Sequence, residues 1–376
     1  MQFTLENTDD QTSARAGEIV TDHGHIPTPV FMPVGTLGTV KAVDQDDLLN
    51  KVKAQIILGN TYHLYLRPGN EIMQASGGLH KFMGWDNPIL TDSGGYQIFS
   101  LSEIRDLKEK GATFKSHLDG SKHLFTPENV VETQRILGSD IMMILDECPP
   151  YPAERDYVEN SMKLTHRWAK RGREHFLKTK PHYGHNQLQF GIVQGGVHKD
   201  LRKESSEYMA SLDFEGLAIG GLSVGEPTEL MYEITDFNTD HLPKEKPRYL
   251  MGVGTPANLL QNIAYGVDMF DCVMPTRNAR NGMIFTRHGK VNVRNAKWKH
   301  HHKPFDTDFP SELCQRYNMS YIHHLIKSNE ILGLELTSKH NLVFYLWLMQ
   351  VVKDRINDGT FGNWYREMMT TVDQKI

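Results

Sequence analysis

Five short apolar runs of the sequence end in acidic, amide, serine or glycine residues. These ends are Asp92-Ser93-Gly94-Gly95-Tyr96-Gln97, Asp146-Glu147-Cys148, Gln194-Gly195-Gly196, Gly220-Gly221-Leu222-Ser223, and Asp271 between Phe270 and Cys272. A single Asp or Gly at the end of a strand is more often a turn or capping residue than a catalytic one. Several polar run ends that meet in one place indicate a functional site rather than turns. We therefore interpret these residues as an active site.

Two isolated carboxylates, without a Ser or Cys nucleophile and its base, suit displacement at the anomeric carbon of a sugar. One carboxylate attacks C1′ and the other handles protons, which gives a covalent intermediate and retention of configuration. We expect Asp92 and Asp271 to form this pair. Asp146 and Gln194 suit a purine-like edge, because a carboxylate accepts hydrogen bonds from ring N–H and amino groups, whereas an amide both donates and accepts them.

Small and stacking residues near these carboxylates suit a flat ligand. Gly95, Gly196 and Gly221 allow the backbone to approach such a ligand closely. Tyr96 or Met251 offers a side chain that stacks on its faces.

Basic residues are concentrated in two short segments that follow Asp271. These segments are PTRNARNG (275–282) and KWKHHHK (297–303). Short basic runs are usually solvated surface, but Arg277 and Arg280 would stand at the rim of the expected active site. The phosphates of a polyanionic substrate would bind favourably there.

The elements that must position these residues are eight apolar runs. They are VFMPV (30–34), QIILGN (55–60), ILTDSGG (89–95), DIMMILD (140–146), LQFGIVQGG (188–196), GLAIGGLSVG (216–225), RYLMGVG (248–254) and MFDCVMP (269–275). Such runs are typical of strands buried on both faces, and helix-like stretches separate most of them. Eight alternations predict a (β/α)8 barrel, whose chemistry lies at the carboxyl ends of its strands. A doubly wound sheet is the alternative, but no GxGxxG motif opens a first helix.

Two helices and a hairpin are predicted between these runs. Thr126 precedes the helix-like segment 127–138, which starts with a proline, and KDLRKESSEYMASL (199–212) is the second helix. Apolar and polar residues alternate in FKSHLDGSKHLFTP (114–127) around Asp119-Gly120, which is typical of a hairpin.

The regular alternation ends after the eighth run. Residues 277–340 contain short strand-like pieces and a polar, His-rich stretch. We interpret them as a small subdomain inserted into a single barrel domain that spans residues 1–376. The last barrel helix is expected at NLVFYLWLMQVVKDRI (341–356), bounded by Asn357 and Gly359.

Composition narrows the class of protein. The chain has 376 residues, with 41 Lys and Arg against 46 Asp and Glu, so its net charge is −5. This mild acidity argues against nucleic-acid binding over the whole surface. The three cysteines (Cys148, Cys272 and Cys314) are too few for a disulfide framework or a four-cysteine zinc site. Because the sequence has no long apolar run and no signal pattern, we expect a cytoplasmic protein with no membrane contact.

Five longer motifs carry a family resemblance. They are LTDSGGYQ (90–97), GIVQGG (191–196), GLAIGGLSVGE (216–226), YLMGVGTP (249–256) and GVDMFDCVMPTRNARNG (266–282). They closely resemble the bacterial queuine tRNA-ribosyltransferase family, also called tRNA-guanine transglycosylases. The similarity extends from TPVFMPVGT (28–36) to the final helix. It implies a (β/α)8 TIM barrel with N-terminal strands and a zinc-binding subdomain inserted after the eighth strand.

The resemblance also implies an activity. Members of the family are pentosyltransferases that exchange guanine at the wobble position of tRNAs with a GUN anticodon for a 7-deazaguanine, in queuosine biosynthesis. Asp271 corresponds to the nucleophile that attacks C1′ and Asp92 to the general acid/base. The base-recognition residues are then Ser93, Tyr96, Asp146, Gln194, Gly221, Leu222, Glu226 and Met251. Glu226 would support an alternative orientation of the Leu222 peptide.

The tRNA-contacting segments implied by the resemblance follow the seventh and eighth runs. They comprise Gly252, Val253, Gly254, Thr255, Pro256, Ala257, Asn258, Thr276, Arg277, Asn278, Ala279 and Arg280. Bacterial members take 7-aminomethyl-7-deazaguanine, whereas eukaryotic ones take the bulkier queuine. Cys148 and Val224 match the bacterial type of pocket, so we expect the smaller base.

The sequence departs from the family at the zinc site. The family pattern is Cys-x-Cys-x-x-Cys followed by a distant His, and only Cys314 and His340 match it. Phe309 and Ser311 stand at the other two positions. Because two ligands do not make a tetrahedral structural site, we expect no zinc there and no other cofactor. Candidate replacement ligands are Asp308, Glu312 and the His300–His302 run.

Other functions remain as alternatives. The family includes non-catalytic partner subunits, but both expected catalytic aspartates are present here. A barrel nucleosidase acting on small nucleosides explains the carboxylates and not the basic rim. A purely RNA-binding module leaves the acidic site unexplained, because buried unpaired carboxylates are costly. The family also implies a homodimer, with His323 and His324 in a helix near its interface.

Overall fold

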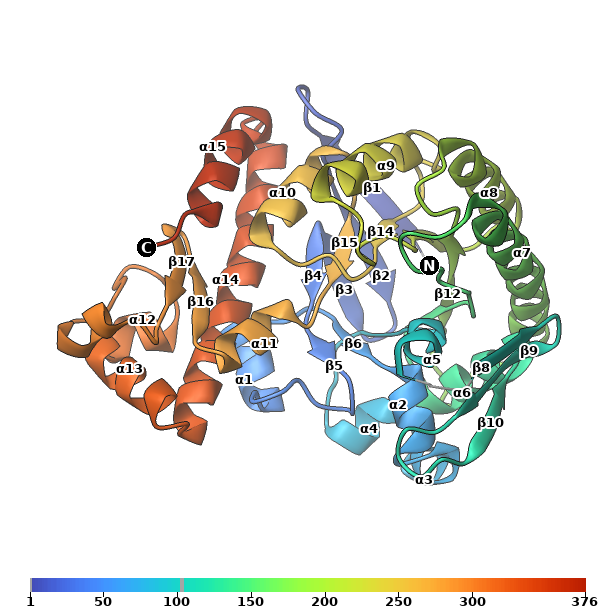
Figure 1. The fold of residues 1–376 in the computed structure, drawn as a ribbon, viewed down its shortest axis with the longest axis horizontal. Coiled ribbons are helices and arrows are strands. Elements are labelled where there is room, and N and C mark those ends of the chain that lie inside the picture. Colours follow the sequence, from blue (N-terminus) through green and yellow to red (C-terminus); the bar gives the residue numbers. More distant parts are fainter. Residues whose placement is uncertain (1, 102–104) are drawn as a thin grey trace.

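The computed structural model describes residues 2–101 and 105–376, and a parallel sheet that closes on itself lies at its centre (Figure 1). The strand order is β4-β15-β14-β13-β12-β11-β7-β6-β5. The bounds are β4 (Val30–Met32), β5 (Val34–Gly35), β6 (Ile57–Gly59), β7 (Ile89–Thr91), β11 (Ile141–Met143), β12 (Leu188–Val193), β13 (Gly216–Ile219), β14 (Arg248–Leu250) and β15 (Met269–Asp271). The predicted (β/α)8 barrel is confirmed, and each of the eight predicted runs contains a barrel strand.

The first run closes the barrel because it pairs on both sides. Val30 of β4 pairs with Met269 of β15, and Val34 of β5 pairs with Leu58 of β6, both in parallel. Pro33 stands between β4 and β5 and has no N–H to donate to a ladder, so one run becomes two short strands. All six residues of β12 are buried, as expected for strands covered on both faces.

Helices cover the outside of the barrel (Figure 1). Their bounds are α1 (Gln45–Asp47) with a π-helical turn at Leu48–Val52, α2 (Thr61–Leu66), α3 (Asn70–Ala75), α4 (Leu79–Met83), α5 (Gly95–Leu101), α6 (Pro127–Leu137), α7 (Arg155–Lys178), α8 (Lys199–Ser211), α9 (Thr228–Asp240) and α10 (Pro256–Ala264). The two predicted helices are α6 and α8. A capping box starts α6, since Thr126 accepts from the N–H of Asn129 and the Asn129 side chain accepts from the N–H of Thr126.

Two small antiparallel sheets flank the barrel. The first contains β1 (Gln2–Thr8), β2 (Arg15–Thr21) and β3 (Gly24–Thr28). It lies against the N-terminal ends of the barrel strands, because Arg15 bonds to Asp268 directly before β15. The second contains β8 (Arg105–Lys108), β9 (Gly111–Lys115) and β10 (Lys122–Phe125). The predicted hairpin at Asp119-Gly120 joins β9 to β10, and β8 was not predicted.

The segment after β15 lies beside the barrel (left side of Figure 1). It contains α11 (Met274–Arg280), the hairpin β16 (Met283–Thr286) and β17 (Gly289–Asn292), a 3-10 turn at Ala296–His300, α12 (Glu312–Arg316) and α13 (Met319–Lys327). The chain then returns through α14 (Ile331–Asn357) and ends in α15 (Phe361–Asp373).

The start predicted for the long final helix was wrong, because α14 begins at Ile331 and not at residue 341. Its early turns bury polar side chains that are held by hydrogen bonds, so they carry no apolar signal. Lys339 bonds to Asp47 at 2.6 Å, and His340 bonds to the carbonyl oxygen of Phe285 at 2.8 Å. Helix α15 was not predicted. Within the two described stretches, no helix is long and apolar enough to span a membrane.

Candidate active site

Asp92 follows β7 and is held by the neighbouring strand end. Its carboxylate accepts hydrogen bonds from the Asn60 side chain at 2.5 Å and from the backbone N–H groups of Thr61 at 2.9 Å and Gly94 at 3.2 Å. Asn60 follows β6 and also caps α2. Two successive strand–helix junctions therefore fix the orientation of this side chain.

The pKa of Asp92 is raised to about 7. Burial is the largest cause, and the nearby carboxylates of Asp271 and Asp146 add to it. The hydrogen bonds from Thr61 and Gly94 act in the opposite direction. An aspartate with this pKa exchanges its proton readily at neutral pH, which suits a general acid/base.

Asp271 ends β15 in a different environment. One carboxylate oxygen accepts from the Tyr249 hydroxyl at 2.6 Å and from the N–H of Gly252 at 2.9 Å. Burial raises the pKa of Asp271, and these two hydrogen bonds favour its ionised form. A fixed carboxylate with one oxygen bonded in this way is suited to nucleophilic attack through the other.

Asp146, Ser93 and Gln194 form a hydrogen-bonded group from three strand ends. Asp146 accepts from the Ser93 hydroxyl at 3.1 Å and from the Gln194 amide at 2.8 Å. Burial raises the pKa of Asp146 to about 6. The Gln194 side-chain oxygen is buried, and no group in the described part of the chain donates to it. This group can therefore accept hydrogen bonds from the N–H groups of a ligand.

The end of β13 closely approaches Gln194. Gly221 has a φ of +64°, and a Cβ atom at this position would lie 2.3 Å from the side-chain oxygen of Gln194. Only glycine fits both constraints. Leu222 is buried next to it. Glu226 accepts hydrogen bonds from the backbone N–H groups of Ser223 and Val224.

The predicted stacking residues differ in exposure. Tyr96 lies on α5 and is 49% exposed, whereas Met251 is half-buried and packs against the core.

Cys148 is buried beside Asp146 and lines a small cavity with Gly95. Burial raises the pKa of the Cys148 thiol to about 12, so this thiol is neutral and contributes shape rather than charge.

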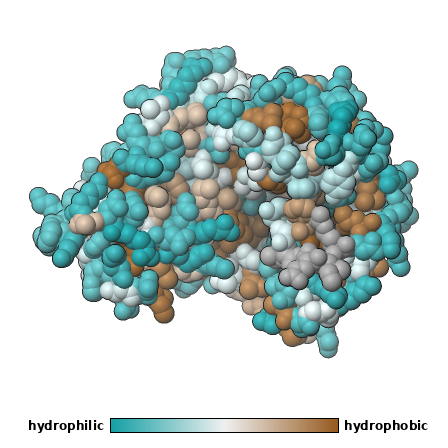
Figure 2. All heavy atoms as spheres, viewed as in Figure 1, coloured by the Kyte–Doolittle hydropathy of each residue, from teal (hydrophilic) through white to brown (hydrophobic). Residues whose placement is uncertain are grey.

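The residues expected to contact tRNA lie after β14 and on α11. Exposed positions are Gly252 and Arg277. Half-buried positions are Thr255, Ala257, Asn258, Asn278 and Arg280. Buried positions are Val253, Gly254, Pro256, Thr276 and Ala279, which can shape this surface but expose little side chain to a ligand. The face seen in Figure 2 is mostly hydrophilic, with hydrophobic residues near its middle and at a few places on its edge.

Sequence reasoning missed Asn60, Thr61 and Tyr249, which orient the two catalytic candidates. Asn60 is the last residue of the second predicted run, so its place at a strand end was an available signal. Tyr249 lies inside an apolar run, where nothing distinguishes it from a core aromatic. Its hydroxyl is the largest hydrogen-bond contribution that favours the Asp271 anion.

Arg202 on α8 was missed as well. It is 0% exposed, and its hydrogen-bond partners in the described chain are backbone carbonyl oxygens. Its guanidinium donates to the carbonyl oxygens of Gly196 at 2.7 Å, Val193 at 3.1 Å and Gly220 at 2.8 Å. A longer contact of 3.4 Å reaches Gly221. Arg202 therefore connects the ends of β12 and β13, which carry the base-site residues.

The four positions that correspond to the family zinc site lie close together. The imidazole of His340 bonds to the Ser311 hydroxyl at 2.9 Å through Nδ1 and to the carbonyl oxygen of Phe285 through Nε2. The Cys314 sulfur lies 3.6 Å from the same Nδ1. Phe309 is 2% exposed and packs against His340 with ring centroids 5.6 Å apart. A phenyl ring and a hydroxyl replace two thiolates, so these residues do not fit zinc.

Comparisons with known proteins agree with this geometry. The family model for queuine tRNA-ribosyltransferase matches residues 9–374. A queuine tRNA-ribosyltransferase from Caldanaerobacter subterraneus subsp. tengcongensis is 55% identical over 369 residues, 98% of this chain and 97% of the relative. One from Desulforapulum autotrophicum is 54% identical over 361 residues, 96% of each chain. The chain therefore belongs to the queuine tRNA-ribosyltransferase family and is a pentosyltransferase.

Proposed function

We propose that this enzyme exchanges guanine at the wobble position of tRNAs with a GUN anticodon for a 7-deazaguanine base, through a covalent bond between Asp271 and the ribose. The observation that supports this proposal is the contrast between two buried carboxylates. Burial raises the pKa of both groups, that of Asp92 to about 7, which suits a proton carrier at neutral pH. Asp271 differs because the Tyr249 hydroxyl and the Gly252 N–H bond to one of its oxygens, favour its ionised form and leave the other oxygen for attack on C1′.

The first displacement releases guanine. A carboxylate oxygen of Asp271 forms a bond to C1′ while the bond from C1′ to the base nitrogen breaks. The base takes the electron pair of that bond and a proton from Asp92. In the second displacement the Asp92 carboxylate removes a proton from the incoming base, whose nitrogen attacks C1′. The bond to Asp271 then breaks, and both carboxylates return to their starting state.

The base would be held by Asp146 and Gln194. The Asp146 carboxylate can accept from an N–H and an amino group on one edge of guanine. The unpartnered oxygen of Gln194 offers a further acceptor. Cys148 and Val224 support 7-aminomethyl-7-deazaguanine as the incoming base. With both bases offered in competition, preferential incorporation of queuine would contradict this choice.

The decisive experiment measures exchange of labelled guanine into a GUN tRNA by the wild type and by Asp271→Asn. We expect loss of about 10³-fold or more, because the substituted amide is not a nucleophile. Asp119→Asn, at an exposed turn, serves as the control and should retain full activity. Near-normal exchange by Asp271→Asn would show that the nucleophile is elsewhere. If the wild type releases guanine from the tRNA without incorporating the labelled base, the nucleosidase alternative is favoured.

Three further properties follow from the family as proposals. The partner is a tRNA, and the enzyme acts in the cytoplasm. The oligomeric state is a homodimer, formed with the segment that carries His323 and His324. Residues Tyr321 and Ile331, which are 40% and 77% exposed, are apolar side chains of that segment available for such a contact. Light scattering on the purified chain tests this state, and a monomer at micromolar concentration would contradict it.

We also propose that the segment between β15 and α14 folds without zinc at the family position. The Phe309 side chain fills the place of one zinc ligand and makes apolar contacts there. Both ring nitrogens of His340 already bond to Ser311 and Phe285. The double substitution Phe309→Cys and Ser311→Cys should restore four ligands and add about one zinc per chain relative to the parent. Phe309→Leu with Ser311→Ala is the control and should add none. Failure of the cysteine pair to add zinc would show that the backbone no longer fits the metal.

A further inference from the structure

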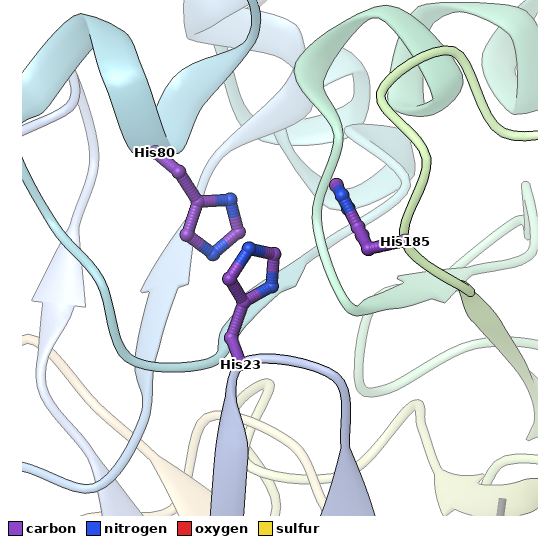
Figure 3. Close-up of side chains that lie close together, drawn as sticks. All are labelled: His23, His80 and His185. Carbon is purple, nitrogen blue, oxygen red and sulfur yellow. The ribbon is translucent and has the colours of Figure 1, made fainter.

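Three histidines meet at the end of the barrel opposite the catalytic carboxylates. We call His23, His80 and His185 the histidine cluster (Figure 3). His23 lies in the turn between β2 and β3, His80 on α4, and His185 in the loop before β12. One nitrogen from each imidazole lies within 4.8 Å of one from each of the others. Residues from three distant segments thus place three metal-binding groups together.

Each imidazole of the cluster has one nitrogen bonded to an oxygen. Nδ1 of His23 bonds to Asp140 at 2.7 Å, Nε2 of His80 to the carbonyl oxygen of Asn87 at 3.2 Å, and Nε2 of His185 to the carbonyl oxygen of Gly138 at 2.9 Å. For the second nitrogen of each ring, the described residues provide no hydrogen-bond partner. Histidines that bind metals show this pattern, because a carbonyl or carboxylate oxygen accepts the remaining N–H and fixes the tautomer.

Asp140 connects two members of the cluster. It directly precedes β11, is 0% exposed, and accepts from the backbone N–H of Ile89 at 2.8 Å. Its two oxygens lie 2.7 Å from His23 and 3.2 Å from His80. A buried carboxylate bonded to two imidazoles is a partner that orients metal-binding histidines and compensates the charge of a cation.

We propose that the histidine cluster binds one divalent transition-metal ion of the zinc type, with Asp140 as the supporting carboxylate. Three imidazoles are a ligand set that zinc accepts, with a fourth position left for water or the carboxylate. The rings of His23 and His80 are stacked, with centroids 3.8 Å apart and planes 17° apart. One of these rings must rotate for both lone pairs to point at the ion. The three histidines are half-buried, so the ion can enter from solvent.

This site is separate from the family zinc positions. Cys314 lies on α12 and His340 on α14, after the last barrel strand. The histidine cluster lies on the barrel itself, beside the turn of the N-terminal sheet. Its role would be to tie that turn to the barrel, since His23 comes from β2–β3 and its partners come from barrel connections.

The test uses the untagged full-length enzyme, freed of metal by a chelator and titrated with zinc by calorimetry and with Co²⁺ by visible absorption. We expect one ion per chain and a tetrahedral or five-coordinate Co²⁺ spectrum. His185→Gln and His23→Gln should each weaken zinc binding at least about 100-fold, because each removes one of three ligands. His182→Gln removes an exposed histidine of the same loop and should bind as the wild type does.

A second set of variants separates this site from the other candidate. Cys314→Ser should leave zinc binding unchanged, whereas a loss with Cys314→Ser and not with His185→Gln would place the ion in the family position. Circular dichroism monitors folding, and His185→Gln is informative even where His23→Gln fails to fold. The proposal is overturned if the wild type takes up no stoichiometric zinc, or if His185→Gln binds zinc as well as His182→Gln does.

Discussion

Asp92 and Asp271 are the same chemical group in two different hydrogen-bond environments. Asp92 accepts from amide donors of the neighbouring strand end, and burial together with two other carboxylates raises its pKa. Asp271 accepts from a tyrosine hydroxyl and a backbone N–H that favour its charge. The orientation of the two carboxylates therefore depends on Asn60 and Tyr249 as well as on the aspartates.

The raised pKa of Asp92 predicts a pH dependence. The protonated form is needed to release guanine, and its fraction falls as pH rises through about 7. We expect kcat/KM for the tRNA to be level just below this pH and to fall about tenfold per pH unit above it, as for one ionising group. A pH–rate profile in guanine exchange measures this. A profile that stays flat to pH 9 would contradict the role of Asp92 as the acid.

The variant Asp92→Asn tests the raised pKa of Asp92 through the stability of the protein. Because the folded-state pKa lies above the ordinary value of 3.8, ionisation of Asp92 lowers stability as pH rises from about 4 to 7. The amide has no such cost. We expect this variant to lose exchange activity and yet to unfold at a temperature no lower than that of the wild type at pH 8. Marked destabilisation would instead indicate that Asp92 is a structural anion.

How far the site could be predicted depends on where each residue stands along the chain. Asp92, Asp146, Gln194 and Asp271 end apolar runs, so their convergence followed once a barrel was recognised. The orientation of Asp271 by Tyr249 could not be predicted, because that hydroxyl comes from the middle of another strand. Arg202 was hidden for a similar reason: a charged residue on a helix is usually exposed, and its burial depends on four carbonyl oxygens that only the folded loops bring together.

At the scale of elements, α8 holds the base site through Arg202. The guanidinium contacts both the end of β12, which carries Gln194, and the end of β13, which carries Gly221. A buried cation without a carboxylate partner is costly unless every N–H is bonded. Here the N–H groups of Arg202 bond to carbonyl oxygens at both strand ends, which offsets this cost and holds the two loops together.

Arg202→Met should therefore affect binding of the base more than the chemical step. We expect KM for the incoming base to rise about tenfold or more, equivalent to at least one hydrogen bond to a charged group, with a smaller change in kcat. Arg202→Lys should restore part of the affinity. Arg135→Lys alters another buried arginine, which bonds to Gln187 and to carbonyl oxygens, and is the control for destabilisation alone. If Arg135→Lys and Arg202→Met raise KM equally, Arg202 has no specific role in positioning the base site.

The start of α14 also shows what the sequence pattern cannot predict. Helix α14 was predicted from its apolar half, while the turns from Ile331 to His340 are helical because polar groups find partners across the interface. Lys339 pairs with Asp47, and Thr337 donates to the carbonyl oxygen of Ala279. Periodicity detects apolar burial and cannot detect this polar burial.

At the scale of the whole molecule, an acidic chain must bind a polyanion. The net charge is −5, so attraction depends on local cations. Arg277 is exposed, and Arg280 is half-buried with an Nη1 atom that lacks a hydrogen-bond partner among the described residues. Burial and the charge of Arg277 lower the pKa of Arg280. Two neighbouring cations that repel each other in this way form a site that a phosphate group would stabilise.

This arrangement predicts how salt affects binding. Arg277→Ala should weaken tRNA binding and lower the slope of log K against log salt concentration by about one, because one phosphate contact is lost. Lys178→Ala removes an exposed cation at the end of α7, far from the catalytic carboxylates, and should leave the slope unchanged. Fluorescence anisotropy with a labelled GUN tRNA at a series of salt concentrations measures both. If the two variants reduce the slope equally, then tRNA binding depends on the overall charge of the protein and not on the cations beside Asp271.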